Sequence, residues 1–391
     1  MNIGEIIKAE LCTGCSSCKN VCPTYAISME RNAYAETIPI INKNICIDCG
    51  KCIMICHSVN EVKKYKPIKC LAAYSLNSDD QQHSASGGIA SVISRKVIAD
   101  GGGVCGVEWN EDMEAVHKLA YSEQELIKFK GSKYVESHLG DVNEIINVLR
   151  CGRTLLYIGT PCQVAAIKRL TSSYEDQLLT IDLVCHGVPP VEYFKEYIAN
   201  YGTNITDARF RGEKDFWLQL YRNEECIYEQ FNWYDKYFSA FMENLIFREC
   251  CYSCKYATDK RIGDFTLGDF WGLSEDSRLA KYKGRKSLVL LNTEKAKNFF
   301  NRIRSDCKFE IRSLDEAKLE NHQLNCPSVP PEDREIFLKY YQERGFSRAI
   351  TKTNVYKKIR LKKGMKIKNV FKQKTLSLWR KNEKSWNNNH A

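Results

Sequence analysis

Eight of the nineteen cysteines in this chain form two copies of one spacing. The first C-x2-C-x2-C-x3-C run extends from Cys12 to Cys22, and the second extends from Cys46 to Cys56. Three thiolates at this spacing wrap one 4Fe–4S cluster, while the fourth thiolate of each run reaches the other cluster. We therefore predict two clusters with crossed ligands. The first set is Cys12, Cys15, Cys18 and Cys56, and the second set is Cys46, Cys49, Cys52 and Cys22.

Zinc is the alternative metal for these thiols, because four-cysteine zinc sites also use C-x2-C pairs. A duplicated run of four cysteines is much more specific than one such pair, so we favour a two-cluster ferredoxin module of the bacterial type. The second run departs from the usual pattern, since Cys56 is followed by His57 and not by proline. We expect this change to affect the loop geometry and not the number of ligands.

The length of 391 residues is too great for a single core and predicts several domains. The chain lacks an apolar run of eighteen residues and a secretory signal, which favours a cytoplasmic protein with reduced thiols. The predicted parts are a ferredoxin domain (1–62), an N-terminal flavin-binding part (68–160), a C-terminal part with a third cluster site (161–348) and a basic tail (349–391).

A βαβ unit is predicted in the middle of the chain. Residues 154–159 and 178–184 read as short apolar strands, and Pro161 suits the first turn of the helix between them. The two strands should be parallel, because the helix returns the chain to the same edge of the sheet. Cys162 and Cys185 then follow the carboxyl ends of neighbouring strands, where open α/β sheets bind ligands. Apolar spacing also predicts helices over residues 89–100, 141–150, 191–201 and 234–247.

Six further segments carry a resemblance to a known family. In chain order they are SASGGIASVIS, GSKYVESHLG, LLYIGTPCQVAAIKRL, DLVCHGVPPVEYFKEYI, RECCYSCKYATDKRIGDFTLGDFWG and NHQLNCPSVPPEDREIFLKYY. Together they resemble the family of coenzyme F420 hydrogenase and dehydrogenase beta subunits, over about residues 5–348. The resemblance implies an α+β multidomain protein, in which the ferredoxin-like module precedes a mixed α/β flavin-binding domain. It also implies FAD and a third 4Fe–4S cluster.

The resemblance assigns flavin contacts to three segments. Ser86, Gly87 and Gly88 match a glycine turn against FAD, and a glycine pair at a helix N-terminus offers backbone N–H groups to a pyrophosphate. The alternative for this turn is a plain helix start. The other matched residues are Ser132, Lys133 and Tyr134 in the second segment and Gly159, Thr160 and Gln163 in the third.

Lys133 has a possible catalytic role in this assignment. Its charge would neutralise a phosphate or the N1 region of the flavin, and Tyr134 would pack on a ring. The alternative is a solvated lysine beside a core tyrosine.

The third cluster is assigned by the same resemblance to Cys162, Cys185, Cys251 and Cys254, with Cys250 as a competitor for Cys251. Buried structural cysteines are the alternative. We expect a lowered pKa for Cys162, because a helix N-terminus stabilises a thiolate. His186 either contacts the flavin or transfers a proton, or is merely structural.

These assignments predict an iron–sulfur flavoprotein oxidoreductase that exchanges electrons with an unidentified substrate, either coenzyme F420 or a bacterial metabolite. Its redox partner would be a ferredoxin or a reduced deazaflavin. The alternative is a non-catalytic electron-transfer subunit that serves a separate catalytic partner. From Lys352 onward the tail has thirteen Lys or Arg residues and one acid, Glu383, so its charge exceeds the net charge of +10 of the whole chain. It mixes lysine with apolar residues, which favours peripheral membrane contact over nucleic-acid binding. A solvated tail is the other reading.

Overall fold

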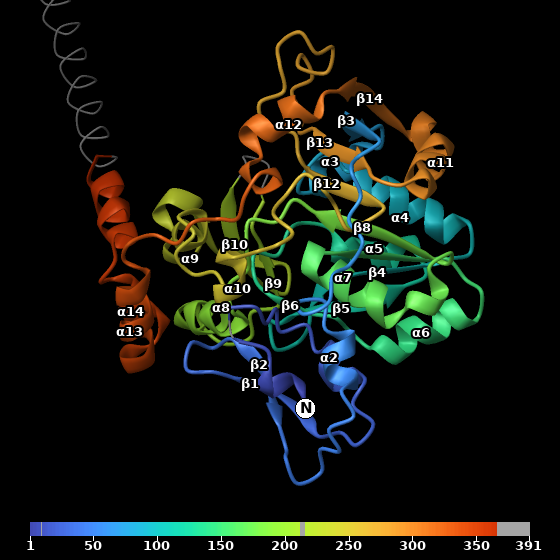
Figure 1. The fold of residues 1–391 in the computed structure, drawn as a ribbon. Coiled ribbons are helices and arrows are strands. Elements are labelled where there is room, and N and C mark those ends of the chain that lie inside the picture. The colour runs from blue at the N-terminus through green and yellow to red at the C-terminus, as the bar shows by residue number, and fades with distance from the viewer. Residues whose placement is uncertain (9, 212–215, 366–391) are drawn as a thin grey trace, which may run out of the picture.

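The computed structural model describes residues 1–8, 10–211 and 216–365 (Figure 1). The ferredoxin module, blue in Figure 1, lies at one end of the molecule. Its elements are α1 (Ser17–Asn20), β1 (Ile27–Arg31), β2 (Thr37–Ile41) and α2 (Lys51–Ile55). The two strands pair antiparallel, and each short helix follows a residue in the left-handed region, Ser16 at φ 63° and Gly50 at φ 73°. These tight turns bring the cysteines of each run close together.

A nine-stranded mixed sheet forms the body of the molecule. In spatial order its strands are β14 (Cys307–Arg312), β3 (Lys69–Ser75), β13 (Ser287–Leu291), β12 (Phe265–Asp269), β8 (Leu178–Leu183), β7 (Leu155–Gly159), β4 (Gly103–Trp109), β5 (Ala115–Ala120) and β6 (Ser137–His138). Strands β12, β8, β7 and β4 are parallel, and β3 shares their direction because β13 pairs antiparallel with both β3 and β12. The carboxyl ends of these five strands therefore meet at one edge of the sheet.

The predicted βαβ unit is confirmed, because α7 (Pro161–Leu170) connects β7 to β8 and these two strands pair in parallel. Neighbouring residues of β7 point to opposite faces of the sheet. Leu156 packs into the core under α4 (Ile89–Ala99) and α11 (Glu294–Ile303), whereas Tyr157 packs into the core under α6 (Val142–Arg150) and α7. The sheet is thus covered on both faces.

Further short helices complete the body. They are α3 (Ser78–His83), α5 (Glu123–Leu126), α10 (Glu249–Tyr252) and α12 (Leu314–Glu320). Strands of the predicted parts 68–160 and 161–348 alternate within the one sheet, since β3 lies between β13 and β14.

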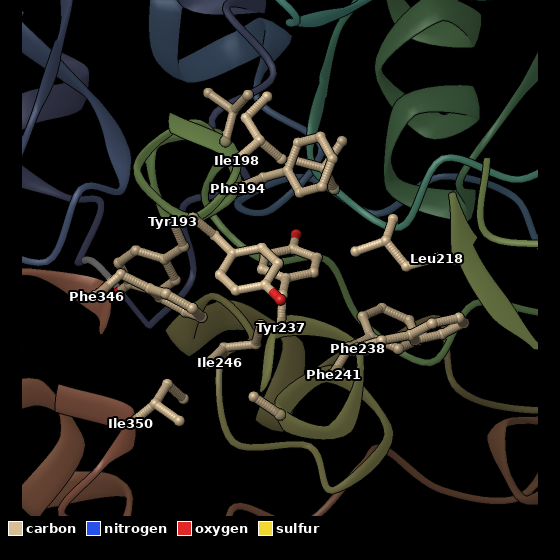
Figure 2. Packing of buried hydrophobic residues seen from close by; sticks show 14 of the residues in the cluster. Tyr193, Phe194, Ile198, Leu218, Tyr237, Phe238, Phe241, Ile246, Phe346 and Ile350 are labelled. Atoms are coloured by element: carbon tan, nitrogen blue, oxygen red, sulfur yellow. The ribbon is translucent and has the colours of Figure 1, made fainter. Parts of the chain in front are cut away.

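A separate aromatic core fills the space beside the sheet (Figure 2). Its elements are α8 (Val191–Ile198), β9 (Asp207–Arg209), β10 (Trp217–Arg222), β11 (Glu225–Phe231), α9 (Lys236–Met242), α13 (Arg334–Arg344) and α14 (Phe346–Ile350). Tyr193, Phe194 and Tyr237 lie at its centre. The predicted helix over 234–247 is shorter than expected, because Asn244 takes a left-handed φ of 58° that stops the helix.

The tail is described only in part. Residues 354–365 are helical, and the predicted membrane-binding segment continues into residues 366–391, which lie outside the described residues. Within the part of the chain that the structure describes, no helix is long and apolar enough to cross a membrane.

Candidate iron–sulfur and flavin site

Two pockets in the ferredoxin module are each lined by four thiols. The outer thiol pocket is lined by Cys22, Cys46, Cys49 and Cys52. The inner thiol pocket is lined by Cys12, Cys15, Cys18 and Cys56. Each pocket has an empty volume of about 330 Å³, and each combines three thiols of one run with the last thiol of the other. Four cysteines around one space form the donor set of a 4Fe–4S cluster.

The thiols surround these spaces and do not converge on a point. Among residues 1–8, 10–211 and 216–365, no three His, Cys, Asp or Glu side chains lie close enough together to hold a single metal ion. The inner thiol pocket is also lined by Ile3, Ile7 and Met29, which shield it from water. In the outer thiol pocket, the backbone N–H of Ala26 donates to Cys22 Sγ at 3.2 Å. An apolar surrounding and a hydrogen bond to sulfur are both suited to thiolates that bind a cluster.

A third and larger pocket, here called the central pocket, lies at the carboxyl edge of the sheet. Its empty volume is about 800 Å³. Cys162 at the start of α7 and Cys185 just after β8 both line it, as the βαβ order predicts. The other three thiols in its wall are Cys250, Cys251 and Cys254. The central pocket therefore has one thiol more than a four-cysteine site needs.

The central pocket adjoins the inner thiol pocket. Thr13 and Ser58 of the ferredoxin module line both pockets. The outer thiol pocket shares no lining residue with the central pocket among the described residues. Cys18 of the inner thiol pocket and Cys52 of the outer thiol pocket pack in one small core, so the three pockets form a series from outer to inner to central.

The expected low pKa of Cys162 is wrong. Burial raises the pKa of this thiol well above its usual value, and the nearby Cys254 and Cys185 raise it further, while a contact of 3.2 Å with Thr160 Oγ1 opposes the rise only in part. Burial likewise raises the pKa of Cys185 to about 12. Thiols grouped in this way away from water ionise readily only when a bound cation compensates their charge.

A buried ion pair fixes the loop that carries Cys254. Arg261 and Asp182 are 1% and 0% exposed, and Arg261 Nη2 lies 2.8 Å from Asp182 Oδ1. Arg261 also donates to the backbone oxygens of Tyr256 and Thr258, both at 3.0 Å. Asp182 is the penultimate residue of β8 and lies three residues before Cys185, so one pair positions thiols from two segments.

A second buried ion pair joins the ferredoxin module to the body. Arg248 is 1% exposed and pairs with Glu136. Its Nη2 atom donates to Thr37 O at 2.9 Å and to Cys12 O at 3.3 Å, both in the ferredoxin module. Arg248 directly precedes α10, so the same residue anchors the backbone beside Cys250.

The predicted flavin residues lie along the same edge of the sheet as the central pocket, but the hydrogen bonds of several are used within the protein. Ser86 Oγ donates to Gly268 O and Lys286 O, and Gly87 N donates to Ser287 Oγ at 2.9 Å. A Cβ on Gly87 would lie 2.5 Å from Ala73 O, so this glycine is required for packing. Gly88 caps α4 at φ 82°, which places the first turn of that helix at the sheet edge.

The second flavin segment belongs largely to the aromatic core. Tyr134 stacks on Phe241 with ring centroids 4.5 Å apart, and its hydroxyl accepts a hydrogen bond from Arg211 Nε at 3.1 Å. Ser132 is hydrogen-bonded to the same tyrosine. Lys133 Nζ donates to Lys128 O at 3.3 Å, and burial lowers the pKa of Lys133 to about 8. Lys133 is therefore held beside the core and not freely solvated.

The third flavin segment opens α7. Gln163 Oε1 accepts hydrogen bonds from Thr160 N and Thr160 Oγ1, both at 3.0 Å, and Gln163 Nε2 donates to Ser137 O at 2.8 Å. This arrangement holds Gly159, the last residue of β7, next to the start of the helix. Of the predicted flavin contacts, only Thr160 lines the central pocket among the described residues.

His186 lines the central pocket beside Cys185. Its side chain is exposed, and its carbonyl accepts a hydrogen bond from Ser328 Oγ at 2.6 Å. Partial burial of the ring against the pocket wall lowers the pKa of His186 below its usual value, so the neutral imidazole prevails near pH 7.

Sequence reasoning missed the residues that hold these pockets in place, above all His57, Tyr256, Arg248 and Arg261. One signal was available for His57, since it stands where the ferredoxin pattern has proline. The arginines gave no comparable signal, because their partners are far away in the sequence.

Two family models match the chain. Residues 152–317 match the C terminus of the coenzyme F420 hydrogenase/dehydrogenase beta subunit, and residues 11–60 match a 4Fe-4S dicluster domain. Residues 152–317 therefore carry a C-terminal domain of the coenzyme F420 hydrogenase/dehydrogenase beta-subunit family. Its N-terminal module is a 4Fe–4S dicluster domain, and the matched beta-subunit region contains all five thiols of the central pocket.

Individual relatives agree with these two matches. An F(420)H(2) dehydrogenase subunit of Methanosarcina mazei is 24% identical over 193 residues, which cover 47% of this chain and 55% of the relative. The chain thus spans about half the length of that relative. An uncharacterized polyferredoxin-like protein of Methanocaldococcus jannaschii is 30% identical over 122 residues, which cover 26% of this chain and 73% of the relative.

A solved structure of the F420-reducing [NiFe] hydrogenase complex from Methanosarcina barkeri contains a chain that aligns with this one at a TM-score of 0.42 and 15% identity. The alignment covers 74% of this chain and 91% of that chain.

Proposed function

We propose that this beta-subunit relative is an iron–sulfur flavoprotein oxidoreductase, in which three 4Fe–4S clusters connect an external one-electron partner to FAD. The observation that carries the proposal is the central pocket, where thiols gather at the ligand-binding edge of the sheet and share a wall with the inner thiol pocket. The substrate is a hydride carrier such as coenzyme F420 or a bacterial metabolite. The one-electron partner is a ferredoxin-like protein, and the site of action is the cytoplasm, with peripheral membrane contact through the tail.

The ligand sets follow from the pocket linings. The outer and inner thiol pockets would each hold one cluster on their four cysteines. In the central pocket the third cluster would be held by Cys162, Cys185, Cys254 and one of the adjacent pair Cys250 and Cys251. We assign Cys251, because the resemblance matches Cys251 and Cys254 as a C-x2-C pair, and Cys250 is then a free thiol beside the cluster.

The residues of the sheet edge fit a flavin in the remaining space. The central pocket is larger than either ferredoxin pocket. A flavin accepts two electrons as hydride and releases them one at a time to clusters. Thr160 and His186 line the pocket and offer a hydroxyl and a neutral imidazole to such a ring. The first turn of α4 after Gly88 offers backbone N–H groups suited to a phosphate, and Lys133 offers a cation.

A second candidate function is a non-catalytic electron-transfer subunit. The relative from Methanosarcina mazei is named as a subunit of a dehydrogenase, which favours this possibility. Such a subunit would need a stoichiometric partner that carries the chemistry.

Flavin content distinguishes the two functions. We expect protein purified without oxygen to release about one FAD per chain on acid denaturation, since a single flavin suffices to convert hydride into single electrons. Anaerobic addition of reduced coenzyme F420 should bleach the flavin absorbance. The electron-transfer subunit would show two other results. It would take up no flavin even after reconstitution, and a pull-down from native extract would recover a stoichiometric partner with it.

The crossed ligands predict which cluster each variant affects. Cys22→Ser should alter the EPR signal of the cluster on Cys46, Cys49 and Cys52, although Cys22 belongs to the first run, because the fourth thiolate of each run reaches the other cluster. Cys56→Ser should alter the signal of the inner cluster instead. If Cys22→Ser and Cys18→Ser perturbed one and the same cluster, each run would bind its own cluster and the crossed assignment would be wrong.

A further inference from the structure

A hydrogen-bonded pair of side chains lies in the wall between the inner thiol pocket and the central pocket. His57 is 0% exposed and directly follows Cys56. Its Nδ1 atom lies 2.7 Å from the hydroxyl of Tyr256, and its Nε2 atom lies 3.1 Å from Thr13 Oγ1. Both hydroxyls can donate or accept, so both nitrogens of a neutral imidazole have a partner in either tautomer.

Tyr256 belongs to the other side of this wall. It is 3% exposed and lines the central pocket, two residues after Cys254. Tyr256 packs in one core with Cys162 and Cys254 of the central pocket and with Cys15 of the inner thiol pocket. The phenol ring therefore lies between the two sets of thiols.

His57 reaches the inner set of thiols as well. Thr13, which lies 3.1 Å from His57 Nε2, lines the inner thiol pocket together with Cys15. The carbonyl of His57 accepts a hydrogen bond from Lys255 Nζ, which ties the same two loops together through the backbone. A continuous hydrogen-bonded connection thus runs from Thr13 at the inner thiol pocket through His57 to Tyr256 at the central pocket.

A buried hydroxyl points to the same wall from the sheet. Tyr157 is 0% exposed, and its OH has no hydrogen-bond partner among the described residues. Tyr157 packs in the same core as Tyr256, Cys162 and Cys15. Unpaired buried hydroxyls are rare and call for an acceptor, and a cluster sulfur on Cys162 or Cys15 would be one.

We propose that His57 and Tyr256 bridge the inner cluster and the third cluster, fixing their separation and setting the difference between their reduction potentials. The inference rests on the proposed function, because it requires a third cluster in the central pocket. Each transfer moves one electron, which oxidises one cluster and reduces the other by one unit and leaves the protons of the bridge in place. Hydrogen bonds to cluster sulfurs and their ligands are a recognised determinant of cluster potential.

The bridge also explains the histidine in the ferredoxin pattern. Proline at position 57 has no side-chain nitrogen and could bind neither Thr13 nor Tyr256. The Tyr256 hydroxyl would then be buried without its partner. His57 and Tyr256 are consequently positioning residues that act between two clusters and not on the substrate.

The test uses the full chain reconstituted with iron and sulfide. Tyr256→Phe keeps the ring and removes the hydroxyl, and His57→Leu removes both ring nitrogens, whereas His57→Gln retains a donor and an acceptor. Tyr237→Phe is the matched control, because it removes a buried tyrosine hydrogen bond, to Tyr134 O at 2.8 Å, in the aromatic core. Cluster potentials come from EPR-monitored redox titration, and electron exchange comes from freeze-quench EPR.

We expect Tyr256→Phe and His57→Leu to slow exchange between the inner and third clusters about tenfold. We also expect a roughly tenfold change in the exchange equilibrium, which is about 59 mV for a one-electron couple. His57→Gln should change the exchange rate and the exchange equilibrium less than His57→Leu does. Tyr237→Phe should match the unaltered protein in both quantities. If the iron content is three clusters per chain and Tyr256→Phe changes neither quantity, the bridge is refuted while the proposed function stands. An iron content of two clusters per chain in the unaltered protein refutes the proposed function and the bridge with it.

Discussion

Replacing Arg248 with alanine is expected to release the ferredoxin module from the body and to destabilise the protein by about 3–5 kcal/mol, the range for removing one partner of a buried ion pair. Glu136 would be left nearly buried with only the more distant Arg31, at 3.7 Å, as a cation, and Thr37 O and Cys12 O would each lose a donor. The inner thiol pocket would then lose its contact with the central pocket.

Urea unfolding and limited proteolysis measure these effects. In Arg248→Ala we expect a lower urea midpoint and new cleavage between residues 60 and 68, where the module joins the sheet. Arg209→Ala is the control. Arg209 pairs with Asp207 at 2.9 Å within the body, and its side chain is 55% exposed, so its loss should change stability by less than about 1 kcal/mol. Equal effects of the two variants would contradict the anchoring role of Arg248.

Replacing Asp182 with alanine is expected to have a similar effect on stability and a larger effect on the central pocket. Arg261 would remain buried without a counter-charge, at a cost of about 3–5 kcal/mol. The backbone N–H groups of Ile262 and Gly263 would also lose their acceptor, Asp182 Oδ2, at 3.0 and 2.7 Å. The loop from Cys254 to Gly263 should therefore become mobile, and the third cluster should be lost or become labile.

Iron content and the urea midpoint distinguish this outcome from general unfolding. Asp182→Ala should retain the EPR signals of the two ferredoxin clusters while losing that of the third cluster. Asp276→Ala is the control, because Asp276 pairs with Arg312 at 2.8 Å with a side chain that is 71% exposed. A variant Asp182→Ala with full iron content and an unchanged midpoint would show that the ion pair does not hold the loop.

The parts of the fold that follow from local patterns could be predicted from the sequence. Apolar spacing and Pro161 gave β7, α7 and β8 and their parallel pairing. From the parallel pairing it follows that Cys162 and Cys185 lie at the same edge of the sheet, and both line the central pocket.

The contacts that join distant segments could not be predicted. Arg248 and Glu136 are 112 positions apart, and Arg261 and Asp182 are 79 positions apart, so no local pattern links them. Position alone was also misleading for Cys162. Its place at a helix N-terminus favours a thiolate, but burial among other thiols outweighs that effect and raises its pKa.

Tyr134 shows the limit of carrying a residue over from a family motif. The sequence left open whether it packs on a flavin or in the core, and the structure places it against Phe241 and Phe238. A motif identifies a segment. Whether a given side chain of that segment faces the cofactor or the core depends on elements that come later in the chain, here Phe238 and Phe241 of α9.

Iron and acid-labile sulfide per chain, measured on protein purified and reconstituted without oxygen, test the series of three clusters most directly. We expect about twelve irons and about twelve sulfides, as three 4Fe–4S clusters require. About eight of each would mean that the thiols of the central pocket hold no cluster, and would contradict the proposed path from the ferredoxin module into the sheet.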